Sequence, residues 1–236
     1  MQARFQQIKS VILDQISEGE MVPGDRVLSE NQLAEQYQVS RMTARRALTE
    51  LVTEGILARS QGLGTFVCDH RPMSSMLEIQ SIQDEIKQRG HKYANAQISK
   101  KVVLATEQQA MWLDVAPNSE IFHTQIVHLE NGLPVQLEDR LVNPLWAPDY
   151  LKQNFDKTTA NQYLNAVAPL TEADHIVEAI APNEFLIKTL NIAATQPCLK
   201  ISRRTYSTKG IVSYALLYHP GNRYRLGSHL EFNRIN

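Results

Sequence analysis

Three arginines close together are the side chains of this sequence best suited to contact a nucleic acid. Arg41, Arg45 and Arg46 lie within six residues, and Thr43 stands among them. On a helix these positions share an outward face. Guanidinium groups form paired hydrogen bonds with guanine and also bind phosphates. The residue types and their spacing therefore predict a helix that lies in the major groove of double-stranded DNA.

Two short amphipathic helices are predicted to position the arginines. Residues 33–37 and 44–52 carry apolar side chains at the three-and-four spacing of one buried helix face. Ser29 and Ser40 precede these runs as N-caps, and "YQVS" forms the turn between them. The order is helix, tight turn, helix, with the arginines on the exposed face of the second helix.

A glycine-bearing hairpin is predicted directly after the second helix. The runs "ILARS" and "TFVCD" flank the turn "QGLG", which contains Gly62 and Gly64. A hairpin that follows a recognition helix is a wing. We therefore expect a winged helix-turn-helix DNA-binding domain over residues 1–70.

The predicted DNA-binding residues differ in the role expected of them. Arg41 and Arg45 are expected to read base edges, and Arg46 either contacts the DNA backbone or only flanks the site. Ser40 and Thr43, with the residues of the wing, position the protein on phosphates or in the minor groove. The full set is Ser29, Glu30, Ser40, Arg41, Thr43, Arg45, Arg46, Gly62, Gly64 and Thr65. An arginine-rich helix face that is merely solvated is the alternative, but it does not explain the succession of helices and hairpin.

The first seventy residues resemble the winged helix-turn-helix of the GntR family of bacterial repressors. The family pattern is matched at Ser29-Glu30, Leu33-Ala34, Ser40-Arg41, Thr43, Arg45, Ala47-Leu48 and "GLGTFV" at 62–67. The resemblance implies a transcriptional repressor that binds operator DNA. Because helix-turn-helix proteins usually pair across a palindrome with half-sites roughly 34 Å apart, a homodimer is expected.

Length and charge restrict the function further. With 236 residues, 43% of them hydrophobic, the chain is long enough for two domains with cores of their own. The net charge is −1, and residues 1–70 hold seven basic and nine acidic side chains. The basic surface that meets DNA must therefore be local.

Cysteine usage and hydropathy exclude other classes of protein. Cys68 and Cys198 are too few and too far apart for a disulfide framework or a cysteine-rich zinc site. The sequence begins with no charged and then apolar leader, and it has no apolar run of about eighteen residues. We expect a cytoplasmic protein with no membrane partner.

The second half of the sequence has a different pattern of predicted elements, in which helices and strands alternate. Residues 71–75, "RPMSS", break the pattern after the wing and are predicted to be a linker to a second domain at 76–236. Helices are expected at 82–89, 106–113, 159–166 and 183–190, and strands at 96–104, 120–129, 134–142, 172–180, 197–206 and 211–219. The turn "ENGL" joins two of these strands as a hairpin. The whole chain is therefore predicted to be α+β, with a mainly antiparallel sheet and packed helices in its second domain.

This half resembles the UTRA effector-sensing domain of one GntR branch, whose fold is shared with chorismate lyase. The resemblance rests on "NGLPVQLE" at 131–138, "ISRRTYS" at 201–207 and "YHPGNRY" at 218–224. It implies a buried pocket for a small-molecule effector.

A closer resemblance is to the HutC-type histidine-utilisation repressors. It rests on "PVQLEDRLVNP" at 134–144, "APDYL" at 147–151, "APLTEADHIVEA" at 168–179 and "HPGNRYRLGSHL" at 219–230. It implies binding to operators of histidine-degradation genes. It also implies that urocanate, the first product of histidine breakdown, is the inducer.

A pocket for urocanate needs a cation for the carboxylate, an acceptor for the imidazole N–H and a flat wall. Glu138 and Arg140 share one face of a strand by its period of two. We expect Arg140 or Arg203 to bind the carboxylate, Glu138 to accept from the imidazole, and Tyr218 or His219 to close the pocket. The predicted effector-binding set is Ser81, His128, Glu138, Arg140, Arg203, Tyr218 and His219. The alternative is that Glu138 and Arg140 pair with each other or line a solvated sheet face.

Two rival functions follow from the same sequence. An enzyme is conceivable by analogy with chorismate lyase, but no catalytic triad, paired carboxylates or metal cluster is evident, so no catalytic residue, metal or cofactor is predicted. A different inducer, such as a sugar phosphate, a fatty acid or another small acid, is the second. Family sensors of phosphorylated amino sugars carry two arginines and a glutamate where this chain has Ile126, His128 and Ser213, which argues against a sugar phosphate.

Overall fold

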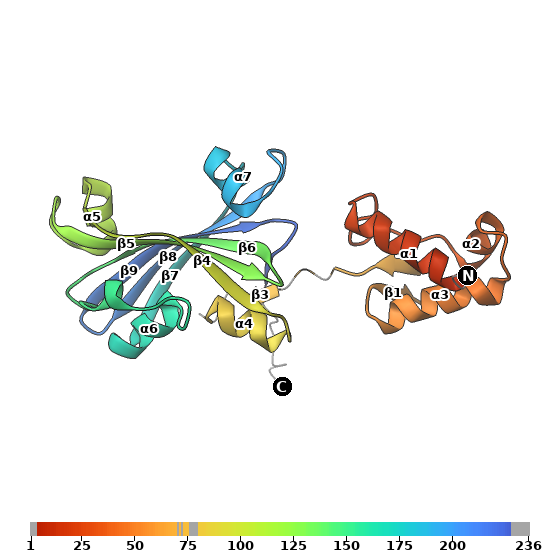
Figure 1. Ribbon diagram of the computed structural model, residues 1–236, viewed down its shortest axis with the longest axis horizontal. Helices are drawn as coiled ribbons and strands as arrows, with labels where there is room; N and C mark the ends of the chain where they lie inside the picture. Colours follow the sequence, from red (N-terminus) through yellow and green to blue (C-terminus); the bar gives the residue numbers. More distant parts are fainter. Residues whose placement is uncertain (1–3, 70, 72, 76–79, 228–236) are drawn as a thin grey trace, which may run out of the picture. The chain divides into compact units, whose positions relative to one another are not determined.

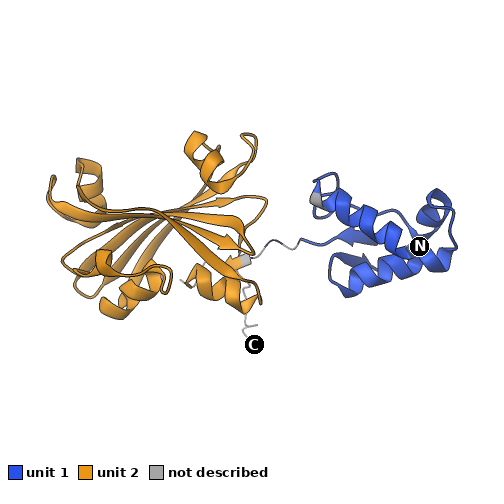
Figure 2. Cartoon of the chain, viewed as in Figure 1, with its two compact units in different colours: residues 1–71 blue, residues 72–236 orange. Residues whose placement is uncertain are grey.

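The chain divides into two compact units, residues 1–71 and 72–236 (Figure 2). The computed structural model describes residues 4–69, 71, 73–75 and 80–227. Parts of the predicted linker, the first residues of the predicted second domain and the end of the motif at 219–230 lie outside these ranges. Within them, no helix is long and apolar enough to cross a membrane.

The first unit consists of three helices and a two-stranded hairpin. Its elements are α1 (Arg4–Ser17), α2 (Glu30–Gln36), α3 (Arg41–Thr53), β1 (Leu57–Ser60) and β2 (Gly64–Val67). The hairpin is antiparallel, from Leu57 opposite Val67 to Ser60 opposite Gly64. The predicted winged helix-turn-helix is thereby confirmed.

Helix α1 completes the core of this unit. It packs against α3, and Ile8 and Ile12 are buried in the same apolar cluster as Leu33 and Leu51. The helices expected from the sequence do not include this one. Its signal was available, because apolar residues recur at intervals of three and four between Phe5 and Ile16.

The second unit is built on one six-stranded antiparallel sheet (Figure 1). In spatial order its strands are β4 (Tyr93–Leu104), β5 (Glu120–Glu130), β6 (Leu133–Val142), β9 (Gly210–Pro220), β8 (Cys198–Ser207) and β7 (Leu170–Ile180). The connections carry α4 (Ile82–Gln88), α5 (Glu107–Leu113), the 3₁₀ turn η1 (Tyr150–Lys152), α6 (Ala160–Val167) and α7 (Glu184–Leu190). The mainly antiparallel sheet with packed helices is as predicted, with strand ends that differ by up to three residues.

The two faces of the sheet have different characters. Helices α5 and α7 cover one face, and α4 and α6 cover the other (Figure 1). On β6, Leu137 and Leu141 pack in the apolar clusters of α7 and α5. The alternating residues Gln136, Glu138 and Arg140 are buried on the face of α4 and α6. Charged residues are rarely buried, so this row marks a site where they are needed.

The predicted linker contains a strand. Residues 73–75 form β3, which pairs in parallel with β10 (Arg225–Gly227), so that Ser74 lies opposite Leu226. The segment was expected to be irregular because it is rich in proline and serine. Its strand conformation comes from a partner about 150 residues away, which local sequence cannot reveal.

Candidate functional site

Helix α3 begins at a tightly capped serine. The Ser40 hydroxyl accepts a hydrogen bond from the Thr43 backbone N–H at 3.1 Å and is bonded to the Thr43 hydroxyl at 2.8 Å. Ser29 caps α2 in the same way, in a capping box with Gln32. Both serines therefore fix the helix ends from which the arginines project.

One carboxylate of the first unit lies close to three arginines. Glu30 lies 3.1 Å from Arg41, 3.9 Å from Arg45 and 3.7 Å from Arg59 of β1. The Arg41 and Arg45 side chains are still 68% and 56% exposed. Exposed ion pairs contribute little to stability, so the effect of Glu30 is to orient guanidinium groups that stay accessible.

Arg46 has a different environment. Its guanidinium lies 3.8 Å from the centroid of the Phe5 ring on α1, and its Nε is 3.1 Å from Glu50. Arg46 thus contacts the neighbouring helix rather than Glu30. Of the two roles that the sequence left open for it, this geometry favours the flanking one.

The wing approaches the same arginines. Gly64 has a φ of +127°, which strains any larger residue, and a Cβ there would lie 2.8 Å from Arg26 Nε and displace that side chain. A hollow of about 280 Å³ between the wing and the helices is lined by Arg26, Val27, Ser29, Glu30, Asn31, Arg41, Leu48, Gly64 and Thr65. Gly62 lies at the tip, with a φ of +77° and nothing near its Cβ position.

The structure adds two arginines that the sequence analysis did not select. Arg26 lies beside Gly64, and Arg59 lies beside Glu30 and also donates to the Thr49 hydroxyl at 2.9 Å. Neither belongs to the periodic pattern of α3. Only the folding of the wing onto the helices brings them to this surface.

In the second unit, a small polar pocket lies under α4 and α6. We call it the inner pocket; it is lined by Gln80, Ile82, Glu85, Gln136, Glu138, Arg140, Thr159, Asn161, Ile201, Arg203, Leu217, His219 and Tyr224. Its free volume is about 20 Å³, which is room for about one water molecule.

Glu138 and Arg140 form a buried ion pair within the inner pocket. Arg140 Nε donates to Glu138 Oε1 at 2.8 Å, and a second nitrogen of Arg140 donates to the Ser213 hydroxyl at 2.8 Å. Burial raises the pKa of Glu138, but Arg140 and His128 outweigh it and hold that pKa below its usual value. The pairing of Glu138 with Arg140, which the sequence analysis kept as an alternative, is present.

Arg203 is the guanidinium of the pocket with unused hydrogen-bonding capacity. Its Nε is buried and has no hydrogen-bond partner among the described residues. Burial, and then repulsion from Arg140, lower the pKa of Arg203 to about 10. A buried cation in this state favours an added anion.

The two candidates for closing the pocket lie on opposite faces. His219 is fully buried, lines the inner pocket and stacks on Tyr224 with ring centroids 3.6 Å apart. Tyr218 pairs in register with Leu137 and packs in the cluster of α7. The prediction for Tyr218 is corrected by the period of two, since adjacent strand residues cannot share a face.

His128 and Ser81 flank the inner pocket rather than line it. His128 is bonded to the Tyr93 hydroxyl at 2.8 Å through Nδ1, and its Nε2 lies 3.7 Å from Glu138. The Ser81 hydroxyl is bonded at 3.0 Å to that of Thr159. Thr159 itself lines the pocket, so Ser81 acts at its edge.

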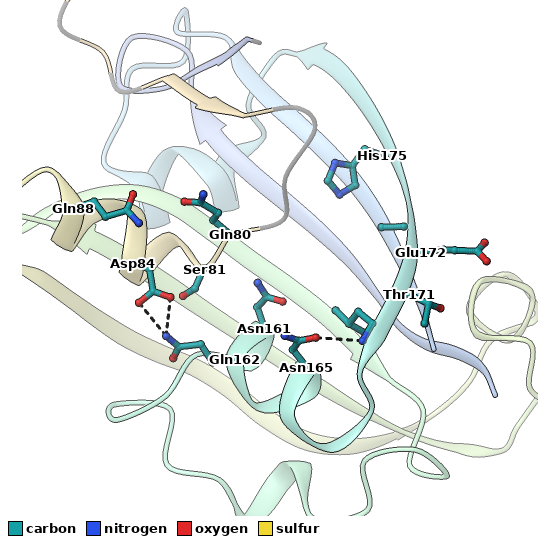
Figure 3. Close-up of a pocket in the computed structure, with 12 residues that line it drawn as sticks. Gln80, Ser81, Asp84, Gln88, Asn161, Gln162, Asn165, Thr171, Glu172 and His175 are labelled. Carbon is teal, nitrogen blue, oxygen red and sulfur yellow. Dashed lines mark hydrogen bonds between the residues drawn. The ribbon is translucent and has the colours of Figure 1, made fainter. Parts of the chain in front are cut away.

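A larger and more open cavity lies beside the inner pocket (Figure 3). This outer pocket has a volume of about 720 Å³ and is lined by Gln80, Ser81, Asp84, Gln88, Asn161, Gln162, Asn165, Leu170, Thr171, Glu172, Ala173 and His175. Gln80 and Asn161 line both cavities. Five of the twelve residues lining the outer pocket carry amide side chains. On one side of the pocket, Gln162 of α6 donates to Asp84 of α4 at 3.0 Å (Figure 3).

Several lining residues were not selected from the sequence, notably Glu85, Thr159, Asn161 and Tyr224. They come from α4, from the start of α6 and from the segment after β9. No periodic pattern links these segments to β6. Among the described residues, no cluster of three potential metal-ligating side chains occurs.

Comparison with known proteins identifies the class to which these sites belong. The model of the gntR family of bacterial regulatory proteins matches residues 5–67, and that of the UTRA domain matches residues 88–225. The chain belongs to the gntR family of bacterial regulators that carry a UTRA domain.

Within that class the chain is similar to histidine utilization repressors. It is 46% identical to that of Pseudomonas aeruginosa over 94% of this chain and 89% of the relative, and 45% identical to that of Klebsiella aerogenes over 94% and 92%. The C-terminal domain of the repressor from Pseudomonas syringae pv. tomato matches with a TM-score of 0.58 and 45% identity, over 60% of this chain and all of that one. PhnF of Mycobacterium smegmatis shares the fold, with a TM-score of 0.68 and 20% identity over 98% of this chain and all of that one.

Lowering the pH is expected to destabilise the second unit through His219. Burial lowers the pKa of His219 to about 3 in the folded protein, whereas an unfolded chain binds this proton below pH roughly 6.5. The stabilisation from the neutral imidazole is complete above pH about 6.5. It is lost as the pH falls toward 3, by up to about 1.4 kcal/mol per pH unit.

Urea unfolding followed by tryptophan fluorescence measures this effect in the second unit, because both tryptophans of the chain, Trp112 and Trp146, lie there. In His219→Phe, the slope of unfolding free energy against pH between about 3 and 6.5 should be smaller by up to about 1.4 kcal/mol per pH unit. This difference corresponds to the uptake of one proton. An unchanged slope would contradict the prediction.

Proposed function

We propose that this protein is a DNA-binding repressor of histidine-utilisation genes, and that urocanate releases it from its operator. The named relatives with 45–46% identity are histidine utilization repressors along nearly their whole length. The observation that carries the choice of an acidic effector is Arg203, whose buried Nε has no partner in the described part of the chain. The proposal includes no catalytic activity, and it places the protein in the cytoplasm with the DNA.

The inner pocket supplies the groups that urocanate requires. Arg140 is engaged by Glu138 and Ser213, so Arg203 is the guanidinium that we assign to the ligand carboxylate. The stacked rings of His219 and Tyr224 offer a flat wall for a conjugated ligand. Ser213 argues against a sugar phosphate, because its hydroxyl supports Arg140 where sugar-phosphate sensors resembling this domain have a carboxylate.

Effector binding must enlarge the inner pocket. A volume of about 20 Å³ is far below the hundreds of Å³ that ligand sites usually have. Glu85 of α4 lines the pocket and is hydrogen-bonded by the Ser74 hydroxyl of β3. β3 directly follows the first unit in the chain. Movement of α4 away from an entering ligand therefore acts on the segment that leads to the DNA-binding unit.

Release from DNA requires that urocanate bind the widened form more tightly than the form that fits the operator. We propose that the widened form changes the placement of the two DNA-binding units in a homodimer and spoils the spacing of the half-sites. A dimer is expected because the first unit carries only a local basic surface. Two copies in register then provide the affinity that one copy lacks.

At the operator, Arg41 and Arg45 are proposed to read base edges while Glu30 fixes their direction. Ser40 and Thr43 hold the start of α3 against a phosphate, and the wing with Gly64 and Thr65 contacts the backbone or minor groove. Arg26 and Arg59 join the predicted set as phosphate contacts. Arg46 is assigned to the edge of the interface because it packs on Phe5.

Replacing Arg45 tests the base-reading role. Arg45→Ala is expected to weaken operator binding by about 1 to 3 kcal/mol and to relax the preference at one base pair. Arg46→Ala is the matched control at the next residue and should change affinity much less. Fluorescence anisotropy with single-base operator variants at one fixed salt concentration measures both. Equal losses in the two variants would remove Arg45 from the reading set.

Adding urocanate tests the inducer and its anchor. Urocanate at 100 times its dissociation constant should raise the free energy of unfolding by about 2.7 kcal/mol and should release the operator. Arg203→Gln should keep operator binding and lose both responses, because the ligand carboxylate has no cation. Arg204→Gln is the control, since Arg204 is the next residue and lies over the Tyr214 ring on the other face. Operator affinity that is the same with and without urocanate in the wild-type protein would refute the proposal.

The oligomeric state of the protein can be measured directly. Sedimentation equilibrium of the full chain should give twice the mass of one chain, both alone and with urocanate. On operator DNA it should give two chains per palindrome. A monomer bound to each half-site independently would contradict the proposed mechanism of release.

A further inference from the structure

A short hydrogen-bonded chain in the inner pocket fixes the orientation of one amide. His219 Nδ1 lies 3.1 Å from the backbone oxygen of Val135, and His219 Nε2 lies 3.0 Å from Gln136 Nε2. A carbonyl oxygen can only accept, so Nδ1 of His219 carries the hydrogen. In a neutral imidazole, Nε2 is then an acceptor, and the Gln136 amide must present its NH₂ group to it.

The other end of this amide has no hydrogen-bond partner within the described part of the chain. Gln136 is 5% exposed, and its Oε1 is buried without a hydrogen bond. Buried carbonyl oxygens are nearly always paired, because an unpaired one loses its bonds to water without replacement. Gln136 cannot relieve this by rotating the amide, since its oxygen would then face the lone pair of His219 Nε2.

This unpaired acceptor lines the same pocket as the unpaired donor Arg203 Nε. The pocket therefore contains one unsatisfied group suited to an anion and one suited to a hydrogen-bond donor. A flat acid with a ring N–H has both groups. Glu138 is the acceptor expected from the sequence, but it already accepts from Arg140 and faces His128.

We infer that Gln136 determines the specificity of the pocket by accepting the ring N–H of the effector, and that His219 is the positioning residue that holds its oxygen toward the ligand. This inference rests on the proposed function, because it assumes that the effector is a heteroaromatic acid bound through Arg203. It assigns the ligand class as planar carboxylates that carry an N–H donor. The competing explanation is that a water molecule is bound to Oε1. In that case the affinity does not depend on an N–H group in the ring of the ligand.

Two ligands and two variants separate these explanations. The ligands are urocanate and 3-(2-furyl)acrylate, which keeps the flat ring and the carboxylate but has no N–H. Calorimetry on the full chain should show that the wild-type protein binds urocanate at least about tenfold more tightly, the value of one hydrogen bond. In Gln136→Leu this ratio should fall to about one, with binding of the furan acid retained. Gln125→Leu is the matched control, because Gln125 lies on the next strand and donates to Asp139 on the other face.

The position of the hydrogen on the His219 ring tests the role of this residue. Nitrogen-15 NMR of the imidazole should show hydrogen on Nδ1 and a free Nε2. His219→Phe should keep the stacking on Tyr224 and lower the ratio of the two affinities, because the amide of Gln136 can then turn. Hydrogen on Nε2 would overturn the inference, since the Gln136 oxygen would already be occupied.

The outcomes also distinguish this inference from the function on which it rests. Tight binding of both acids to the wild-type protein with equal affinity would overturn the role of Gln136 and leave the acidic effector in place. An unchanged ratio in Gln136→Leu would do the same and would favour the water. If neither acid binds the wild-type protein, the proposed effector is wrong and the inference falls with it.

Discussion

The buried ion pair between Glu138 and Arg140 is the interaction on which the pocket of the second unit depends. Charges inside a protein are tolerated only when they are paired and hydrogen-bonded, and Arg140 meets that condition through Glu138 and Ser213. Its guanidinium is therefore satisfied without a ligand. Arg203 of β8 lies in register with Arg140 across Ala215 of β9. Its Nε has no equivalent partner among the described residues. This inequality between the two arginines supports the proposal that an anion binds at Arg203.

The first unit also pairs a carboxylate with arginines, but there the pairs lie at the surface. Glu30 lies near three guanidinium groups, but these are exposed to water, where each pair is weak. A phosphate or a base edge can replace the carboxylate at little cost, whereas the inner pair of the second unit cannot be exchanged. Exposure to water thus distinguishes the replaceable pairs of the first unit from the buried pair of the second.

Local patterns predicted the parts of the molecule that local contacts build. The helix-turn-helix, the wing and the strand face shared by Glu138 and Arg140 follow from spacing along the chain, and so does the correction of Tyr218 in favour of His219. Arg26, Arg59, Tyr224 and the residues of α6 reach their sites through contacts between distant segments, which have no periodic signature. The orientation of Gln136 depends on the backbone carbonyl of Val135 and the ring of His219, which only the folded sheet brings together.

The parallel pairing of β3 with β10 can form only late in synthesis on the ribosome. The first unit folds from contacts within its own seventy residues, so it can form early in synthesis. β3 must wait for a partner about 150 residues further along, which takes roughly 8 to 30 s at bacterial elongation rates. During that interval the first unit of the nascent chain can be folded while the second unit is still incomplete. A chain terminated before β10 would therefore carry a folded first unit and a second unit in which β3 has no strand to pair with.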